Sequence, residues 1–239
     1  MKKLIVVLLA FAMLLSLAAC GGNTTPSTQA PAPTATQAPT PATTAAPKQE
    51  TTASGGGETA APATPGEWET KGLPAIPANC LNGSILVTSV GQSSDADSVI
   101  TILKRLKVDN YTQSNAITAD AVNSSFSVLI LAVGGSSKGL GGAGLDQDKE
   151  TARVKAVIEK AQSLNMTIVC MHTGGTDRRG NLSDAFINLA FPYAQYAIIV
   201  KEGDSNNLMH DILAKNNVPT AYIEKVTNAR EVLAHMLGK

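Results

Sequence analysis

The sequence predicts an α/β domain, a three-layer doubly wound parallel sheet of five or six strands that is flavodoxin-like or Rossmann-like. The first observation is an unbroken apolar run at residues 128–133, which is typical of a strand buried on both faces. The second is that such runs alternate with amphipathic segments of helix length, as in right-handed β-α-β crossovers. The third is that long Gly- and Ser-rich loops directly follow several of the runs.

The strands are predicted from short apolar segments that are rich in β-branched residues and bounded by turn residues. The segment at 111–114 is the weakest of them, because only Tyr111 in it is apolar. The predicted strands are residues 84–90, 111–114, 128–133, 166–171, 196–200 and 219–223.

The helices are predicted from apolar residues that recur at helical spacing after a capping residue. In the first helix, apolar residues occupy i, i+3, i+4 and i+7 counted from Val99, and Ser94 with Asp97 fits a capping box. The later helices are predicted to begin at Thr118, at Asp146 or Asp148, at Ser183, at Asp204 or Ser205, and at Thr227.

The first 20 residues read as a lipoprotein signal peptide. Two lysines precede a short apolar run, and the segment ends in Leu-Ala-Ala-Cys, which resembles a bacterial lipobox with Cys20 as the lipidated residue. The alternative is an ordinary signal peptide with a chance cysteine. The lipobox predicts export and anchoring through acylated Cys20 to the outer face of the bacterial cytoplasmic membrane, or to the periplasmic face of the envelope.

Residues 21–71 are predicted to be a disordered Thr/Ala/Pro tether, because such a composition buries too little apolar area to offset the entropy of ordering. The single α/β domain is then predicted over residues 72–239. Trp68, near the end of the tether, either docks on this domain or is a stray aromatic residue.

Charge and cysteine content narrow the function classes. The chain has 19 basic and 19 acidic residues, so bulk charge predicts no nucleic-acid partner. Cys80 and Cys170 either form a disulfide, which an exported protein permits, or are unpaired thiols. Three dispersed histidines without a cysteine pair at ligand spacing predict no metal site, and no cofactor is predicted.

In a doubly wound sheet the strand order reverses near the first and third strands, and ligands bind beyond the carboxyl ends of the strands there. The loops at 91–95, 134–144 and 172–181 should therefore meet at one crevice. The residues predicted to bind a ligand there are Gln92, Ser93, Ser94, Gly134, Gly135, Ser136, Ser137, Lys138, His172, Gly174, Gly175, Arg178 and Arg179.

The basic residues of these loops predict an anionic ligand. Arg178 and Arg179 each offer a planar fork that suits carboxylate or phosphate, and Lys138 adds a further positive charge. The alternative is that the arginines are solvated or pair with Asp177 and Asp184, which lie nearby in the sequence.

A catalytic role rests on weaker patterns. His172 follows a strand and could act as a base for Ser136 or Ser137, although no G-x-S-x-G elbow is present. The alternative for His172 is a histidine satisfied by loop backbone. The stretch 139–144 matches G-x-G-x-x-G, but it begins five residues after the strand, which favours a chance match over a dinucleotide site.

Three loop motifs carry a resemblance to a known family. They are Gly-Gln-Ser-Ser-Asp at 91–95, Gly-Gly-Ser-Ser-Lys-Gly-Leu-Gly at 134–141, and His-Thr-Gly-Gly at 172–175 with Arg-Arg-Gly at 178–180 and Ser-Asp at 183–184. Together they resemble an uncharacterised family of bacterial secreted α/β domains, a domain of unknown function. The resemblance implies an α/β fold in an envelope protein and supplies no activity.

Three functions therefore stay open at this point. The sequence favours a membrane-anchored extracytoplasmic domain that binds a small anionic ligand at the C-terminal edge of its sheet, and it makes no firm prediction of enzymatic activity. The first alternative is a hydrolase that depends on Ser136 or His172. The second is a structural or interaction module of the cell envelope without a ligand.

Overall fold

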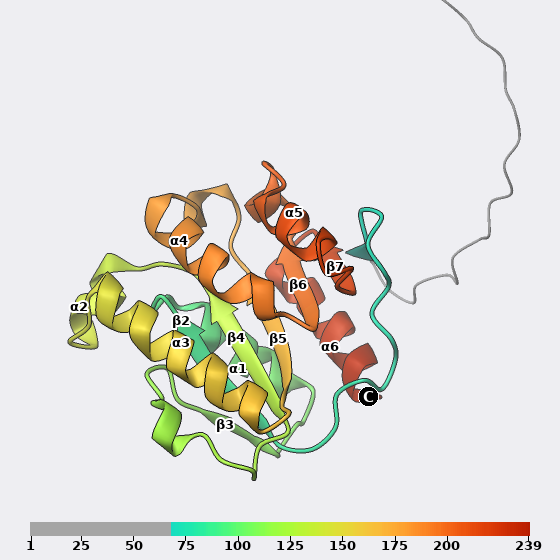
Figure 1. The fold of residues 1–239 in the computed structure, drawn as a ribbon. Coiled ribbons are helices and arrows are strands. Elements are labelled where there is room, and N and C mark those ends of the chain that lie inside the picture. The colour runs from blue at the N-terminus through green and yellow to red at the C-terminus, as the bar shows by residue number, and fades with distance from the viewer. Residues whose placement is uncertain (1–67) are drawn as a thin grey trace, which may run out of the picture. The chain divides into compact units, whose positions relative to one another are not determined.

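The computed structural model describes residues 68–239, which form a seven-stranded sheet in the order β1-β7-β6-β5-β4-β2-β3 (Figure 1). All neighbouring strands are parallel except β1, which runs antiparallel to β7. The strands are β1 (Trp68–Glu69), β2 (Ile85–Val90), β3 (Tyr111–Gln113), β4 (Val128–Val133), β5 (Thr167–His172), β6 (Tyr196–Val200) and β7 (Thr220–Ile223).

Five of the six α-helices within residues 68–239 lie along the two faces of this sheet, with α3, α4 and α5 on the near face in Figure 1 and α1 and α6 behind the sheet, while the short α2 lies in the loop after β4. The α-helices are α1 (Asp95–Arg105), α2 (Ser137–Gly142), α3 (Gln147–Ser163), α4 (Asn181–Ala190), α5 (Leu208–Ala214) and α6 (Ala229–Leu237). Short 3₁₀ turns are η1 (Ala119–Ala121), η2 (Thr176–Arg178), η3 (Phe191–Tyr193), η4 (Lys201–Asp204) and η5 (Val226–Asn228). The predicted three-layer α/β fold is thus confirmed.

The strand order reverses at β2, which pairs with β3 on one side and with β4 on the other. Beyond that point the chain proceeds in one direction through β5, β6 and β7. This is the flavodoxin-type order, in which the crevice between the first and third strands of the parallel sheet is the expected ligand position. The loops that leave β2 and β4 therefore lie side by side at one edge.

Two apolar cores fill the layers on either side of the sheet. Residues of β4 alternate between them, with Leu129 and Leu131 facing α3 and α4, and with Val128 and Ile130 facing α1 and α6. Because both faces of the strand are buried, its sequence is apolar throughout and shows no alternation.

The ordered domain begins at least as early as Trp68, within the segment predicted to be tether. Trp68 and Glu69 pair with Ile223 and Tyr222 of β7, and the indole is only 7 % exposed. Its ring lies 5.7 Å from that of His235 in α6, and the Glu69 carboxylate contacts Lys201 Nζ at 2.5 Å. Of the two predictions for Trp68, docking is the one that the structure shows.

Several helix starts differ from the predicted caps. Asp146 does cap α3, since its side chain accepts from the Lys149 N–H at 2.8 Å. Ser94 precedes α1 without a side-chain capping bond. Ser183 lies inside α4, which begins after Gly180, and its Oγ instead accepts from the Gly135 N–H at 3.0 Å. The serine therefore joins two loops and does not cap a helix.

Both cysteines of the domain are free thiols, Cys80 partly exposed and Cys170 buried in β5. Burial raises the pKa of each thiol. No helix within residues 68–239 is long and apolar enough to span a bilayer. The predicted signal peptide, Cys20 and most of the predicted tether lie outside the described residues.

We expect the Trp68→Ala substitution to destabilise the domain by about 3 kcal/mol, because it empties the space of a large buried side chain. Urea denaturation of the wild type and the variant measures this difference. Tyr193→Ala is the matched control, since Tyr193 is 38 % exposed and its removal leaves no comparable cavity. Equal losses in the two variants would contradict a packing role for the indole.

Candidate functional site

A cavity of about 540 Å³ lies beyond the carboxyl ends of β2, β3 and β4, at the point where the strand order reverses. We call it the switch-point cavity. Polar and small residues from four segments of the chain line it. They are Gln92, Ser93, Ser94 and Asp97, then Asn115, then Ser136, Lys138, Gly139, Gly142 and Ala143, and finally Arg178.

A buried carboxylate supports the floor of this cavity. Asp95 is only 4 % exposed, and its two oxygens accept from Ser93 Oγ at 2.7 Å and from Thr173 Oγ1 at 2.8 Å. Gly134 passes so close to this carboxylate that a Cβ atom there would overlap it. Asp95 thus cross-links the loops that follow β2 and β5, with the loop after β4 between them.

A buried ion pair holds the loop after β2 from the other side. Glu150 is fully buried, and Arg153 binds it with two hydrogen bonds of 2.8 Å. Glu150 Oε1 also accepts from the Gly91 N–H at 2.9 Å and from Gln92 Nε2 at 3.1 Å. Neither residue was among the predicted site residues, because a Glu and an Arg three positions apart on a helix resemble an exposed surface pair.

Arg153 extends the same network to two further segments of backbone. Its Nη2 donates to the carbonyl oxygen of Ser89 at 2.6 Å, and its Nη1 donates to that of Ile117 at 2.9 Å. The end of β2 and the loop after β3 are therefore fixed to α3 by one guanidinium group. The segments of the cavity wall are therefore held by hydrogen bonds within the protein.

Two basic side chains, Lys138 and Arg178, line the cavity. Arg178 Nη2 donates to Ser94 Oγ at 3.3 Å, so it bridges the loop after β5 to the start of α1. Within residues 68–239, neither Lys138 nor Arg178 forms an ion pair with a carboxylate. The Asp97 carboxylate on the same wall accepts from Gln113 Nε2 at 2.9 Å.

Arg179, although adjacent to Arg178, has a different set of partners. Its Nε donates to Asp184 Oδ1 at 2.7 Å, and its Nη1 donates to the Gly203 carbonyl and to Asn206 Oδ1. The Arg179 side chain is 11 % exposed and does not line the cavity. Pairing with Asp184, one of the alternatives drawn from the sequence, is what the structure shows for this arginine.

His172 is buried at the end of β5 and does not line the cavity. Its Nδ1 lies 2.8 Å from the Val133 carbonyl, which requires the proton on Nδ1, and Nε2 has no partner among the described residues. Burial lowers the pKa of the imidazole, and the positive charge of Arg179 acts in the same direction. The Val133 hydrogen bond and the carboxylates of Asp95 and Asp204 raise the pKa, but the net shift is downward.

The predicted nucleophile and base are not joined in this structure. Ser136 Oγ accepts from the Gly139 N–H at 3.0 Å and so caps α2, the short helix that occupies part of the predicted glycine-rich loop. Across residues 68–239, no hydrogen bond connects Ser136 or Ser137 with His172. Gly139 is required there because a Cβ atom would overlap the Gln92 carbonyl oxygen.

The structure thus divides the predicted ligand-binding residues into two groups. The group that lines the switch-point cavity is Gln92, Ser93, Ser94, Ser136, Lys138 and Arg178. The group that lies outside the cavity lining is Gly134, Gly135, Ser137, His172, Gly174, Gly175 and Arg179. Asp97 and Asn115 also line the cavity but were not among the predicted site residues. Asp97 lies inside a helix and Asn115 follows the weakest predicted strand, so neither belongs to the loops from which the site was predicted.

The described part of the chain contains no cluster of three or more His, Cys, Asp or Glu side chains that could hold a metal ion. The polar groups of the cavity are hydroxyls, amides, one carboxylate and two cations. This set suits hydrogen bonding and charge pairing with an organic or inorganic anion.

We expect Glu150→Gln to destabilise the domain by roughly 3 kcal/mol, because it leaves the guanidinium of Arg153 buried without a counter-charge. Thermal or urea denaturation measures the loss. Glu159→Gln, on the exposed face of the same helix, is the control and should change stability little. Similar small effects in both variants would contradict the structural role given to the buried pair.

We expect the wild type to lose stability as the pH falls through about 6.5, in part because the His172 pKa is lowered in the folded state. The unfolded chain then takes up a proton at this residue more readily than the folded chain. His172→Gln removes this contribution. The difference in unfolding free energy between wild type and variant should be constant above that pH. Below it, the wild type should lose stability relative to the variant. Parallel pH profiles would contradict the assignment.

Comparison with solved structures gives only distant similarity. A GDSL-like lipase from Bacteroides thetaiotaomicron shares 9% identity and a TM-score of 0.29, over 57% of this chain and 66% of that one. A putative acylhydrolase from Bacteroides fragilis shares 11% identity and a TM-score of 0.29, over 63% and 71%. The psychrotrophic esterase EstA from Pseudoalteromonas sp. shares 12% identity and a TM-score of 0.29, over 58% and 76%. Similarity this low carries no inference about activity.

Comparison by sequence is more specific. No curated protein matches this chain. A family model described as "Domain of unknown function (DUF6305)" matches residues 82–237, which span β2 to α6 and include all three loop motifs of the cavity edge. The chain therefore belongs to this family of domains of unknown function.

Proposed function

We propose that this domain binds a small anionic ligand in the switch-point cavity. The observation that carries the proposal is that Lys138 and Arg178 line one cavity and that neither forms an ion pair within residues 68–239. Against these two positive charges stands one lining carboxylate, Asp97, so the formal charge of the lining is positive. An anion in the cavity would pair with these two exposed cations.

The hydroxyl and amide groups of the cavity supply the remaining contacts. Ser93, Ser94 and Ser136 together with Gln92 and Asn115 offer donors and acceptors around the two cations. The volume of about 540 Å³ is within the range of small-molecule sites. Because the ion pair of Glu150 and the carboxylate of Asp95 hold the wall in place, little ordering cost is expected on binding.

We further propose that the domain works outside the cell membrane, held by lipid on Cys20. The sequence of residues 1–20 supports export and lipidation, and residues 21–67 supply a Thr/Ala/Pro-rich spacer before the ordered domain. In this arrangement the lipid bilayer is the partner of the acylated cysteine, and the cavity faces solutes of the envelope space. Radiolabelled palmitate incorporation that is lost in Cys20→Ala would test the anchoring.

We expect Arg178→Gln and Lys138→Gln each to weaken anion binding by about tenfold or more, since each removes one charge-assisted contact worth about 1.5–3 kcal/mol. Succinate and inorganic phosphate are suitable first probes, with isothermal titration calorimetry or thermal shift as the readout. Lys155→Gln, on the exposed face of α3, is the charge-matched control. Unchanged affinity in both cavity variants would contradict the proposal.

We expect Gly142→Phe to block the cavity with little cost to the fold. Gly142 lines the cavity, and a Cβ atom added there meets no protein atom within 4 Å. Gly141→Phe is the matched control, because it has the same open surroundings but does not line the cavity. Binding of the same anions should be lost in the first variant and kept in the second, at equal melting temperatures. Equal binding in both variants would place the ligand elsewhere.

A further inference from the structure

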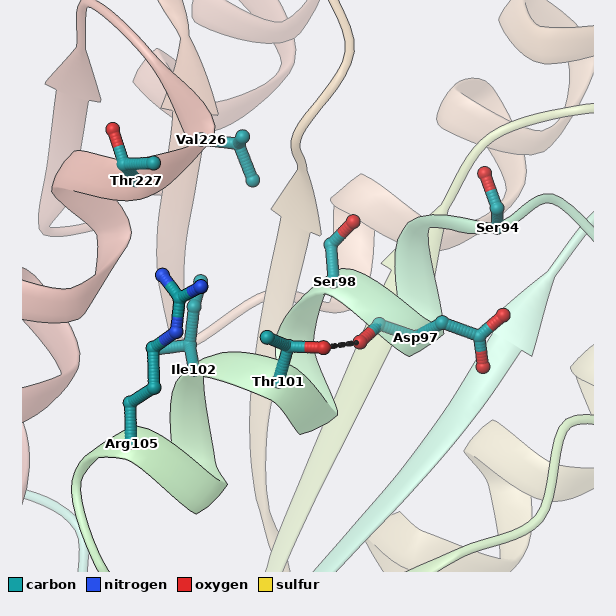
Figure 2. Close-up of a pocket in the computed structure, with 8 residues that line it drawn as sticks. All are labelled: Ser94, Asp97, Ser98, Thr101, Ile102, Arg105, Val226 and Thr227. Atoms are coloured by element: carbon teal, nitrogen blue, oxygen red, sulfur yellow. Dashed lines mark hydrogen bonds between the residues drawn. The ribbon is translucent and has the colours of Figure 1, made fainter.

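A second groove lies along α1, beside the switch-point cavity. It has a volume of about 300 Å³ and lies between α1 and η5 at the end of β7 (Figure 2). The two hollows share Ser94 and Asp97, which belong to the start of α1, so they meet over the first turn of that helix. We call the second hollow the helix groove.

The helix groove has two apolar side chains and the hydroxyls of Ser98, Thr101 and Thr227 in its middle, and it is basic at its far end. Ile102 and Val226 contribute hydrocarbon from its two walls, and Arg105 lines it near the last turn of α1. Figure 2 shows the Arg105 guanidinium pointing back along the helix towards Ile102 and Thr227. Arg105 forms no ion pair within residues 68–239.

The carboxylate at the junction does not neutralise this arginine. Figure 2 shows the Asp97 side chain directed away from Ile102 and Val226, and its carboxylate accepts from Gln113 of β3. Taken together, the two hollows have Lys138 and Arg178 at one end and Arg105 at the other, with Ile102, Val226 and several hydroxyl groups between them. The helix between them has 11 residues, which corresponds to a length of about 16 Å.

We propose that the ligand is an elongated molecule with an anionic group at each end and an apolar middle, which occupies the switch-point cavity and the helix groove together. This inference rests on the proposed function, because it places one anionic end beside Lys138 and Arg178. It adds that the second anionic end pairs with Arg105 and that the middle packs on Ile102 and Val226. Charge complementarity and the length of α1 between the two basic ends favour this class over a compact anion.

Linear dicarboxylates of increasing length test the inference on the full domain. Calorimetric titration would compare succinate, suberate and dodecanedioate with ω-hydroxydodecanoate, which has the length of the longest diacid but only one charge. We expect dodecanedioate to bind at least tenfold more tightly than succinate and than the hydroxy acid. Arg105→Gln should remove this gain and leave succinate binding unchanged, whereas Lys104→Gln, at a neighbouring exposed position outside both hollows, should alter neither.

The outcomes separate the two proposals. If succinate binds in an Arg178-dependent way but affinity does not rise with length, or the rise survives in Arg105→Gln, the elongated ligand is excluded and the anion site stands. If succinate binding is unaffected by both Arg178→Gln and Lys138→Gln, the anion site itself is wrong. If none of the four probes binds, both proposals are overturned for carboxylate ligands.

Discussion

The buried pair of Glu150 and Arg153 is the interaction on which the shape of the site depends. Glu150 accepts a hydrogen bond from the backbone N–H of Gly91, and Arg153 donates to the carbonyl oxygens of Ser89 and Ile117. These contacts bind the end of β2 and the loop after β3 to α3. A buried ion pair is weak evidence for high stability, because desolvation offsets the attraction between its charges. Its value here is geometric, since the pair fixes where the chain leaves the central strands.

A second buried carboxylate completes the frame. Asp95 accepts from Ser93 in the loop after β2 and from Thr173 after β5, while the loop after β4 passes over it at Gly134. Because a buried carboxylate is costly unless it is hydrogen-bonded, the three loops are constrained to an arrangement that keeps these bonds. The residues that line the cavity thus stand on loops that hydrogen bonds within the protein hold together.

The sequence was sufficient for the fold because the strands of this sheet are buried on both faces. Val128–Val133 is apolar at every position for that reason, and the alternation with amphipathic helices then implied parallel crossovers and the reversal beside β2. What the sequence could not show was tertiary pairing of polar groups. Ser183 has the residue type and position of a helix cap, yet its Oγ accepts a hydrogen bond from the Gly135 N–H of a distant loop. Trp68 follows a segment of low complexity, and its place in the sheet depends on pairing with β7, which is distant in the sequence.

Arg178 and Arg179 show the same limit within the site itself. The two residues are adjacent and chemically identical, so no pattern in the sequence separates them. The extended backbone at Arg179, after the turn of η2, sends the two side chains to different surroundings. Arg179 donates to Asp184 and to the Gly203 carbonyl, whereas within residues 68–239 the Arg178 side chain donates only to Ser94 Oγ, at 3.3 Å.

A basic side chain whose hydrogen-bond donors are all paired within the protein serves to position loops. A basic side chain with unpaired donors is available to a ligand. By this criterion Arg178, Lys138 and Arg105 belong to one class, although they come from three separate segments of the chain. All three border hollows that meet at Ser94 and Asp97, over the first turn of α1. The distribution of unpaired charge, more than the count of basic residues in any motif, is therefore the observation behind the proposal of an elongated anionic ligand.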